Sequence, residues 1–306
     1  MSQATESANN RNRQSTFFTR LKKNYIGWIF ILLSVFGIGL FYFYPMVQAF
    51  LLSLKSGMGA NLEFVGFDNY VRLFSDPTFI TSLKNTFIYL LVQVPVMILL
   101  ALFFSVLLND PKLKFRGFFR TAIFLPAVTS LVAYAVIFKY LFGNDGLVND
   151  MLVNLNLISA PLNWLSDPFL AKITIIIAIT WRWTGYNMIF YLSALQNVDK
   201  SMYEAARIDG ASSIQQFFFI TIPMLKPIIL FTSIVSTIGT LQLFDEVMNI
   251  TNGGPGNSTL SISMYIYNLS FEYTPDFGYA ATVSYVIVVL VVILSFIQFR
   301  VAGDRD

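Results

Sequence analysis

The chain reads EAARIDGASSIQQFFFITIPMLKP over residues 204–227, a charged segment set between two long apolar runs. Its ionised side chains are concentrated between Glu204 and Asp209, and Gly210 follows them directly. Because charged side chains are costly to place in hydrocarbon, this segment is expected to lie in water while the runs on either side cross a membrane. It predicts a short exposed helix, a turn, and a second helix that leads back into the membrane.

The composition is that of a membrane protein. Of 306 residues, 56% are hydrophobic and 12% are charged, and the mean hydropathy of +0.64 exceeds that of an ordinary soluble domain. Histidine and cysteine are absent, which excludes disulfides, thiolate or imidazole metal sites, and any mechanism with histidine as general base. The net charge of +3 does not indicate a nucleic-acid partner.

Six apolar runs are long enough to cross a bilayer, which takes about 20 residues. The first is longer than the apolar core of a signal peptide, about 7 to 15 residues, so we expect an uncleaved anchor. The sequence therefore predicts an all-α polytopic membrane protein with six transmembrane helices. Their expected ranges are about 25–52, 85–108, 120–142, 170–195, 226–247 and 278–299.

Basic residues are distributed unequally between the two sides of this predicted bundle. Lysine and arginine are frequent before the first helix and between helices two and three, whereas none occurs from Val247 to Tyr279 on the other side. Because basic loops remain in the cytoplasm, both termini and the segment 199–227 are expected there. The expected domains are a cytoplasmic tail over 1–23, a transmembrane domain over 24–300, and a second cytoplasmic tail over 301–306.

The charged segment contains the residue types that a helix and a turn require. Asp199 or Ser201 can cap the helix, and Gly210 permits a left-handed turn after it. Pro223 and Pro227 are expected to mark the place where the chain bends into the fifth membrane helix.

The spacing within this segment resembles a known motif. Glu204-Ala205-Ala206 is followed by Gly210, and then by Ile220, Ile222 and Pro223. This pattern is similar to the EAA motif of permease subunits in binding-protein-dependent ABC importers, specifically the maltose-type carbohydrate permeases. Leucine is commoner than isoleucine at position 222 in that family, and the exchange preserves volume. The stretch FVGFDNY at 64–70 and the turn Gly253-Gly254-Pro255 also look like such permeases.

By this resemblance, the segment is a coupling helix that docks on a cytoplasmic ATPase and passes its motion to the membrane helices. Glu204 is then expected to pair with a basic residue of the ATPase, and Gly210 to set the turn. The residues to which the resemblance assigns coupling are Glu204, Ala205, Ala206, Asp209, Gly210 and Pro223.

The chain contains no GxxxxGK[ST] pattern, so ATP hydrolysis is expected on a separate polypeptide. This chain is then expected to bind no cofactor, since ATP and Mg belong to the ATPase. The resemblance implies a multi-pass transporter subunit of the cytoplasmic membrane rather than an enzyme. The partners that it implies are a second homologous permease that forms a heterodimer, two ATPase subunits and an extracellular solute-binding protein.

Arg182 lies near the middle of the fourth predicted helix, where an unpaired charge costs at least about 2.5 to 3.5 kcal/mol. It should therefore face a cavity or a partner. The carboxylates available to it in the fifth predicted helix are Asp245 and Glu246. Pairing with a carboxylate and direct contact with a ligand both remain open.

Aromatic rings beside hydrogen-bonding groups suit sugars, because the C–H faces of a sugar stack on rings while its hydroxyl groups need polar partners. Such a mixture occurs on the fourth and fifth predicted helices, and in maltose-type permeases these two helices supply a mid-membrane sugar site. The expected pathway residues are Arg182, Trp183, Tyr186, Asn187, Thr240, Gln242, Leu243 and Asp245.

The expected cargo is a carbohydrate, specifically an oligosaccharide, and the alternative is a glycerol phosphate or an acidic sugar held by Arg182. Two other classes of function fit the sequence less well. A secondary transporter lacks its usual signature here, because the two halves of the chain show no internal repeat. An intramembrane enzyme is disfavoured by the absence of histidine and of a GxSxG motif.

Overall fold

The computed structural model describes residues 25–58 and 61–302, so the predicted tail over 1–23 and residues 303–306 lie outside the described residues. The chain divides into two compact units, 1–53 and 54–306. In the first unit, α2 (Tyr25–Ile38) continues through a π-helical turn, η1 (Gly39–Phe43), into α3 (Tyr44–Ser53). The apolar stretch Ile29–Ser53 is long enough to cross a membrane.

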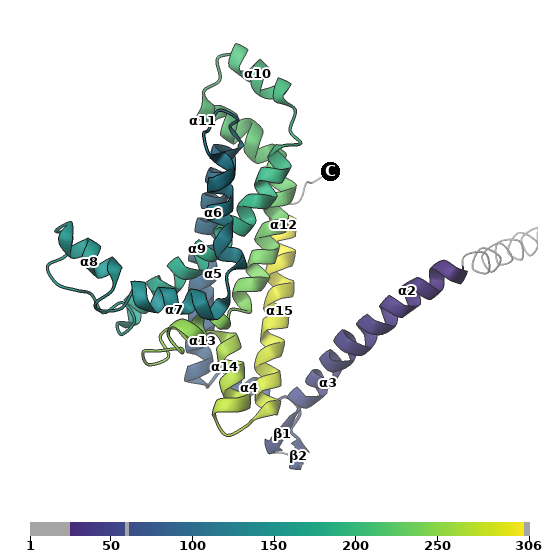
Figure 1. The fold of residues 1–306 in the computed structure, drawn as a ribbon. Helices are drawn as coiled ribbons and strands as arrows, with labels where there is room; N and C mark the ends of the chain where they lie inside the picture. Colours follow the sequence, from purple (N-terminus) through teal and green to yellow (C-terminus); the bar gives the residue numbers. More distant parts are fainter. Residues whose placement is uncertain (1–24, 59–60, 303–306) are drawn as a thin grey trace, which may run out of the picture. The chain divides into compact units, whose positions relative to one another are not determined.

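Four long helices of the second unit lie side by side, namely α5 (Pro77–Asn109), α9 (Pro168–Leu195), α12 (Ile222–Leu241) and α15 (Phe277–Ala302) (Figure 1). Both α5 and α9 begin with an aspartate followed by proline. The carboxylates of Asp76 and Asp167 each accept two backbone N–H groups of the first turn, and the proline lacks the N–H that would otherwise need a partner.

Helix α9 is the most enclosed of the four, because it packs against α5, α6 (Arg116–Val128) and α12. A glycine allows one of these approaches. A Cβ atom added to Gly185 would lie 2.0 Å from the backbone oxygen of Ile123 on α6. Small residues allow membrane helices to pack this closely, so Gly185 fixes where α6 crosses α9.

The chain bends sharply after α6. The stretch predicted as one helix over 120–142 is instead two helices, α6 and α7 (Leu131–Leu141), that meet at 102°. Thr129 and Ser130 are extended between them. A side chain from α9 satisfies the freed backbone there, since Arg182 donates a hydrogen bond to the carbonyl of Thr129. An apolar run alone does not reveal such a bend.

Short elements lie at the end of the unit opposite α10 (Lys200–Ile208) (Figure 1). Strands β1 (Lys55–Met58) and β2 (Asn61–Phe64) form an antiparallel pair in which Lys55 is opposite Phe64. The helical pieces are α4 (Asp68–Leu73), α13 (Asp245–Ile250), α14 (Ile262–Tyr267) and a π-helical turn, η3 (Asn268–Glu272). Helix α8 (Leu147–Asn154) projects from the region of α7 (Figure 1).

A polar network fastens these short elements to the long helices. The guanidinium of Arg72 on α4 pairs with Asp276 at 2.7 Å and lies 3.8 Å from the ring centroid of Tyr279. The carboxylate of Asp76 accepts hydrogen bonds from the hydroxyl groups of Tyr265 and Tyr279. The network therefore ties α4, α14 and the starts of α5 and α15 together.

The loop over 251–259 follows the end of α13. It is held against α5 by side chains of that helix. Asn85 donates to the carbonyls of Asn257 and Leu260, and Tyr89 donates to the carbonyl of Thr259. These bonds satisfy backbone carbonyls of the loop, including those of the buried residues Thr259 and Leu260.

Over residues 25–58 and 61–302 the protein is mostly helical, and four helices in this part are long and apolar enough to cross a membrane: Ile29–Ser53, Pro77–Asn109, Ser213–Leu241 and Phe277–Val301. The count becomes five if the bent pair α6 and α7 is one span. Helix α9 has 28 residues but is not among them. Polar and charged residues lower the mean hydropathy of α9, and several of them are buried inside the protein.

Substituting Gly185 tests the α6–α9 crossing. Gly185→Ala is expected to destabilise the protein by about 1–3 kcal/mol or more, because its Cβ atom would overlap backbone that cannot move aside easily. Thermal unfolding of the purified protein in detergent measures this effect. Gly117→Ala on α6 is the control, since nothing lies within 4 Å of the added atom. Equal melting temperatures for the two variants would contradict the close approach.

The network around Asp76 predicts a dependence of stability on pH. Burial raises the pKa of Asp76, but hydrogen bonds from Tyr265, Tyr279 and two backbone N–H groups outweigh it, so the pKa lies below its ordinary value. The resulting stabilisation is complete above about pH 4 and is lost as the pH falls through the lowered pKa.

Wild-type protein should therefore lose stability relative to Asp76→Asn as the pH falls from neutral to below about 4, as measured by thermal unfolding at a series of pH values. The asparagine keeps the shape of the side chain and its capping oxygen. Melting curves for the two proteins that fall in parallel over this range would refute a contribution from the ionised carboxylate.

Candidate functional site

The charged segment forms a helix, a turn and a second helix, as the sequence predicts. In α10 the N-cap is Asp199, whose carboxylate accepts the backbone N–H of Ser201. Gly210 follows with a φ of +80°, the left-handed conformation that glycine adopts most easily. Helix α11 (Ser213–Gln216) then begins with a capping box formed by Ser212 and Gln215.

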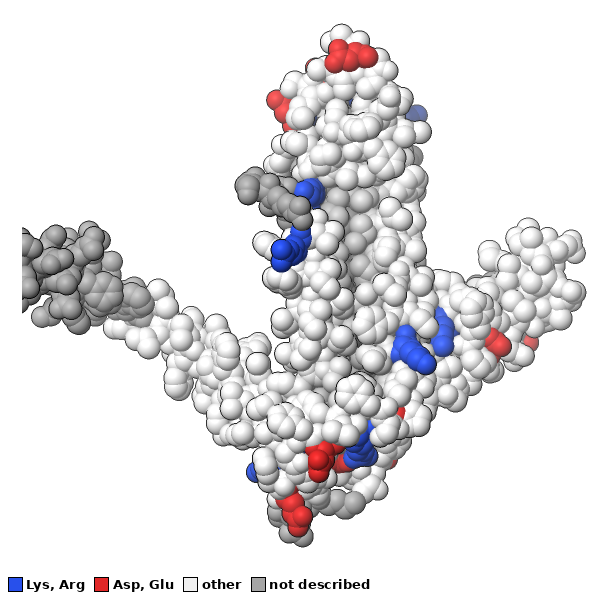
Figure 2. All heavy atoms as spheres, turned by 180° about the vertical axis from the view of Figure 1, so that it is seen from behind, with Lys and Arg blue, Asp and Glu red and all other residues white. Residues whose placement is uncertain are grey.

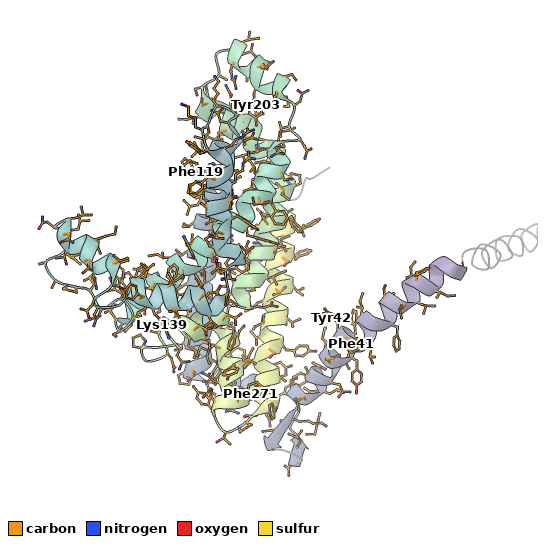
Figure 3. All side chains as sticks on the ribbon, in the orientation of Figure 1. Phe41, Tyr42, Phe119, Lys139, Tyr203 and Phe271 are labelled. Carbon is orange, nitrogen blue, oxygen red and sulfur yellow. The ribbon has the colours of Figure 1, made fainter. Side chains whose placement is uncertain are left out.

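One face of α10 is tied to the rest of the unit. Tyr203, labelled in Figure 3, reaches the hydroxyl of Thr221 at 3.0 Å. The backbone N–H of Ala211 donates to the carbonyl of Ala206 at 2.8 Å, and Gln216 donates to the carbonyl of Ala211. The turn after α10 is therefore held by both side chains and backbone.

The opposite face of α10 is open. Glu204, Ala205 and Asp209 are exposed, and Ile208 has 87% of its surface exposed. Acidic side chains gather at this end of the unit (Figure 2). A tethered helix that presents an isoleucine, an alanine and carboxylates in this way is suited to contact another protein.

Beyond α11 the chain continues into the membrane helix as one uninterrupted helical segment, which we call the rod. The π-helical turn η2 (Phe217–Thr221) precedes α12, and 213–241 form a single span. Pro223 lies in the first turn of α12. Because proline removes one backbone donor and crowds the preceding turn, a wider turn immediately before it is a physical accommodation. Pro223 therefore lies within this rod, directly after its irregular turn.

A row of aromatic rings runs along α9 and reaches α12. The ring centroids of Trp183 and Tyr186 are 5.7 Å apart, those of Tyr186 and Phe190 are 5.1 Å apart, and those of Phe190 and Phe231 are 6.1 Å apart. Trp183 and Tyr186 are each 37% exposed. The prediction omitted Phe190 and Phe231, although the spacing of 183, 186 and 190 on one helical face indicates Phe190.

Two predicted pathway residues meet inside the bundle instead of on this row. The hydroxyl of Thr240 donates to the side-chain oxygen of Gln93 on α5 at 3.1 Å. The amide nitrogens of Gln93 and Asn187 both contact the sulfur of Met97. Thr240 and Asn187 thus join α5, α9 and α12, and sequence reasoning missed Gln93 because its partner is 147 residues away.

The remaining residues of the predicted pathway lie beyond α12. Helix α12 ends at Leu241, so Asp245 starts the separate helix α13 instead of sharing the helix of Thr240. Gln242 and Asp245 are exposed, whereas Leu243 belongs to the apolar core. The structure therefore brings Trp183 and Tyr186 together and places Leu243 elsewhere.

Arg182 is buried, with 7% of its surface exposed. One guanidinium nitrogen donates to the carbonyl of Thr129 at 3.3 Å, at the bend between α6 and α7. The guanidinium carbon lies 5.2 Å from the ring centroid of Tyr134 and 5.6 Å from that of Trp183. Of the two candidate carboxylates, Glu246 is buried and Asp245 is exposed.

Membrane-length helices, a tethered helix exposed at one end, and an aromatic row define a class, the membrane subunit of a transport system. Residues 75–304 match the family described as "Binding-protein-dependent transport system inner membrane component", and the chain belongs to this family. It is a permease subunit of an ABC importer and a multi-pass protein of the cytoplasmic membrane.

Named relatives agree with this assignment. The chain is 58% identical over 281 residues to the lactose transport system permease protein LacF of Rhizobium radiobacter, covering 91% of this chain and 94% of LacF. It is 37% identical over 264 residues to the arabinooligosaccharides transport system permease protein AraP of Halalkalibacterium halodurans, covering 85% of this chain and 82% of AraP.

A solved structure has the same fold. It is a bacterial ABC transporter involved in the import of the acidic polysaccharide alginate, with a TM-score of 0.79 and 24% sequence identity. The match covers 94% of this chain and 98% of that chain.

Loss of the Tyr203 hydroxyl tests the tether of α10. In Tyr203→Phe, the backbone amides of α10 are expected to exchange hydrogen about fivefold faster, since one hydrogen bond contributes about 1 kcal/mol. Hydrogen exchange measured by mass spectrometry reports this change. Tyr140→Phe, at an exposed position of α7, serves as the control. Unchanged exchange in α10 would show that the hydroxyl pair does not hold the helix.

Proposed function

We propose that this chain is the membrane-spanning subunit of an ATP-driven importer that carries a carbohydrate, specifically an oligosaccharide delivered by an extracellular binding protein. The observation that carries the proposal is the aromatic row on α9, in a chain 58% identical to a lactose permease. Rings of this kind stack on sugar faces, and the second named relative also carries an oligosaccharide by its name.

The proposed topology has six membrane spans with both termini in the cytoplasm. Four helices in the described part of the chain qualify by length and composition, and the bent pair α6–α7 is taken as a fifth span. Helix α9 is the sixth, since its 28 residues can cross about 30 Å of hydrocarbon when other helices enclose its polar groups. An even number of spans returns the chain to its starting side, and the distribution of basic residues places that side in the cytoplasm.

The proposed coupling element is α10 with the turn after it. Its exposed face, carrying Glu204 and Ala205 beside the less exposed Ala206, docks on a cytoplasmic ATPase chain that binds ATP and Mg. Asp209 and Gly210 end the helix and turn the chain toward α11. The rod from Ser213 through Pro223 to Leu241 then passes the motion to the level of Thr240.

The proposed assembly follows from this arrangement. One α10 serves one ATPase, so a second homologous permease is needed for a pair of ATPase subunits. The complex is then a permease heterodimer above two ATPase chains, with the binding protein on the outside. The family description supports the binding protein as a partner.

The proposed cargo pathway follows the aromatic row and the polar groups beside it. Trp183, Tyr186, Phe190 and Phe231 offer ring faces, since each lies within 6.1 Å of the next. The hydrogen-bonding side chains assigned to the pathway are those of Asn187 on α9, Thr240 on α12, and Gln242 and Asp245 directly after α12. Leu243 is left out because it lies in the core.

ATP-dependent uptake of lactose by the complete complex in proteoliposomes tests the proposal. Glu204→Lys and Gly210→Pro are each expected to lower uptake about tenfold or more, since reversing a docking charge or distorting the turn weakens binding by at least 1.4 kcal/mol. Membrane insertion should stay normal. Glu63→Lys, at an exposed position of β2 at the opposite end, is the matched control.

Uptake at wild-type rates by both coupling variants would refute the role of α10. Uptake by this chain without any ATPase would make it a secondary transporter and overturn the proposal as a whole.

A further inference from the structure

Arg182 lies where three parts of the second unit meet, the α6–α7 bend, α9 and α13. Its guanidinium already has surroundings that suit a cation. The carbonyl of Thr129 accepts a hydrogen bond from it, and the ring faces of Tyr134 and Trp183 lie within 5.6 Å of its central carbon. Ring faces attract cations electrostatically, so these contacts lower the cost of burying the charge.

Glu246 on α13 is the buried carboxylate beside this cluster, with 5% of its surface exposed. Arg182 lies within electrostatic range of it, and the indole of Trp183 is near enough to donate a hydrogen bond. The two charges do not form a contact ion pair, since Arg72 and Asp276 make the one such pair among the described residues. Both residues are buried, and opposite charges inside a protein attract each other more strongly than in water because protein screens them weakly.

The free-energy cost of burying either charge, Arg182 or Glu246, is lower when the other charge is present. A single buried ion without a partner is strongly unfavourable, whereas removal of both members of a buried pair is often tolerated. The neighbouring Tyr134 is fully buried and interacts electrostatically with both Arg182 and Glu246. The Nε atom of Arg182 has no hydrogen-bond partner among the described residues. However, only 7% of the surface of Arg182 is exposed. A cargo anion therefore has little access to it.

We propose that Arg182 and Glu246 neutralise each other and fasten the α6–α7 bend to α13, so that Arg182 is a positioning residue and not a ligand of the cargo. This inference rests on the proposed carbohydrate import and narrows it: the pathway offers no free cation at this position, and its cargo is an uncharged saccharide. Arg182 would then link the two elements, since the same side chain donates to the Thr129 carbonyl and lies within electrostatic range of Glu246.

A double-mutant cycle tests the pair. The variants are Arg182→Met, Glu246→Gln and the double variant, each in the assembled importer in proteoliposomes. Lys172→Met is the matched control, because it removes another cation from α9. Two quantities are measured for each, the melting temperature of the purified complex and the KM and maximal rate of ATP-dependent lactose uptake. Radioactive lactobionate, the carboxylate analogue of lactose, is tested in parallel.

Each single variant is expected to lower the melting temperature and to reduce the maximal rate about tenfold or more, with KM changed less than about twofold. The double variant should regain most of both losses, to within about threefold of the wild-type rate. Lys172→Met should behave like the wild type, and lactobionate should not be transported.

Several results would overturn the inference. A double variant with a restored melting temperature but the low uptake of Arg182→Met would show that Arg182 acts on the cargo. Single variants with unchanged stability and rate would show that there is no pair. Uptake of lactobionate that Arg182→Met abolishes would refute an uncharged cargo. If the wild type transports neither sugar while the melting temperatures still show compensation, the proposed cargo fails and the pair stands.

Discussion

The structure depends on the enclosure of α9. This helix carries polar side chains along its length, and lipid offers them no hydrogen bonds, so neighbouring protein has to supply their surroundings. Its buried polar residues are Thr174, Thr180, Arg182, Thr184 and Asn187. Helices α5, α6 and α12 surround it, and Gly185 lets α6 approach until backbone meets backbone. The other long helices can then present apolar side chains outward, as a bilayer requires.

Two features of the fold follow from this central helix. The bend between α6 and α7 leaves backbone groups unpaired, and Arg182 of α9 satisfies one of them at Thr129. On the other side, Asn187 and Thr240 meet through Met97 and Gln93, which joins α9 to α12 and α5. Because α12 continues back to α11 without a break, a displacement of α10 can reach the centre of the bundle through one helix.

Much of this arrangement is readable from sequence. Long apolar runs locate the membrane helices, and local chemistry predicts the Asp199 cap and the left-handed Gly210, since both depend on neighbours in the chain. What sequence could not supply is contact between distant residues. The bend at Thr129 lies inside an apolar run, and its stabilising partner is 53 residues away. The end of α12 at Leu241, which separates Asp245 from that helix, was not predicted either. Nothing in the apolar pattern marks where that helix ends.

The central claim is that the exposed face of α10 docks on an ATPase. The chain has no cysteine, so a single cysteine at Ala205 can carry a photo-crosslinker that reports the neighbour of this face alone. We expect illumination of cells that express the whole importer to join the chain to its ATPase subunit, and a crosslinker at Asn252, in the loop at the opposite end of the unit, not to do so. Crosslinking of Ala205 to the binding protein, or its labelling by a membrane-impermeant thiol reagent outside intact cells, would contradict this account.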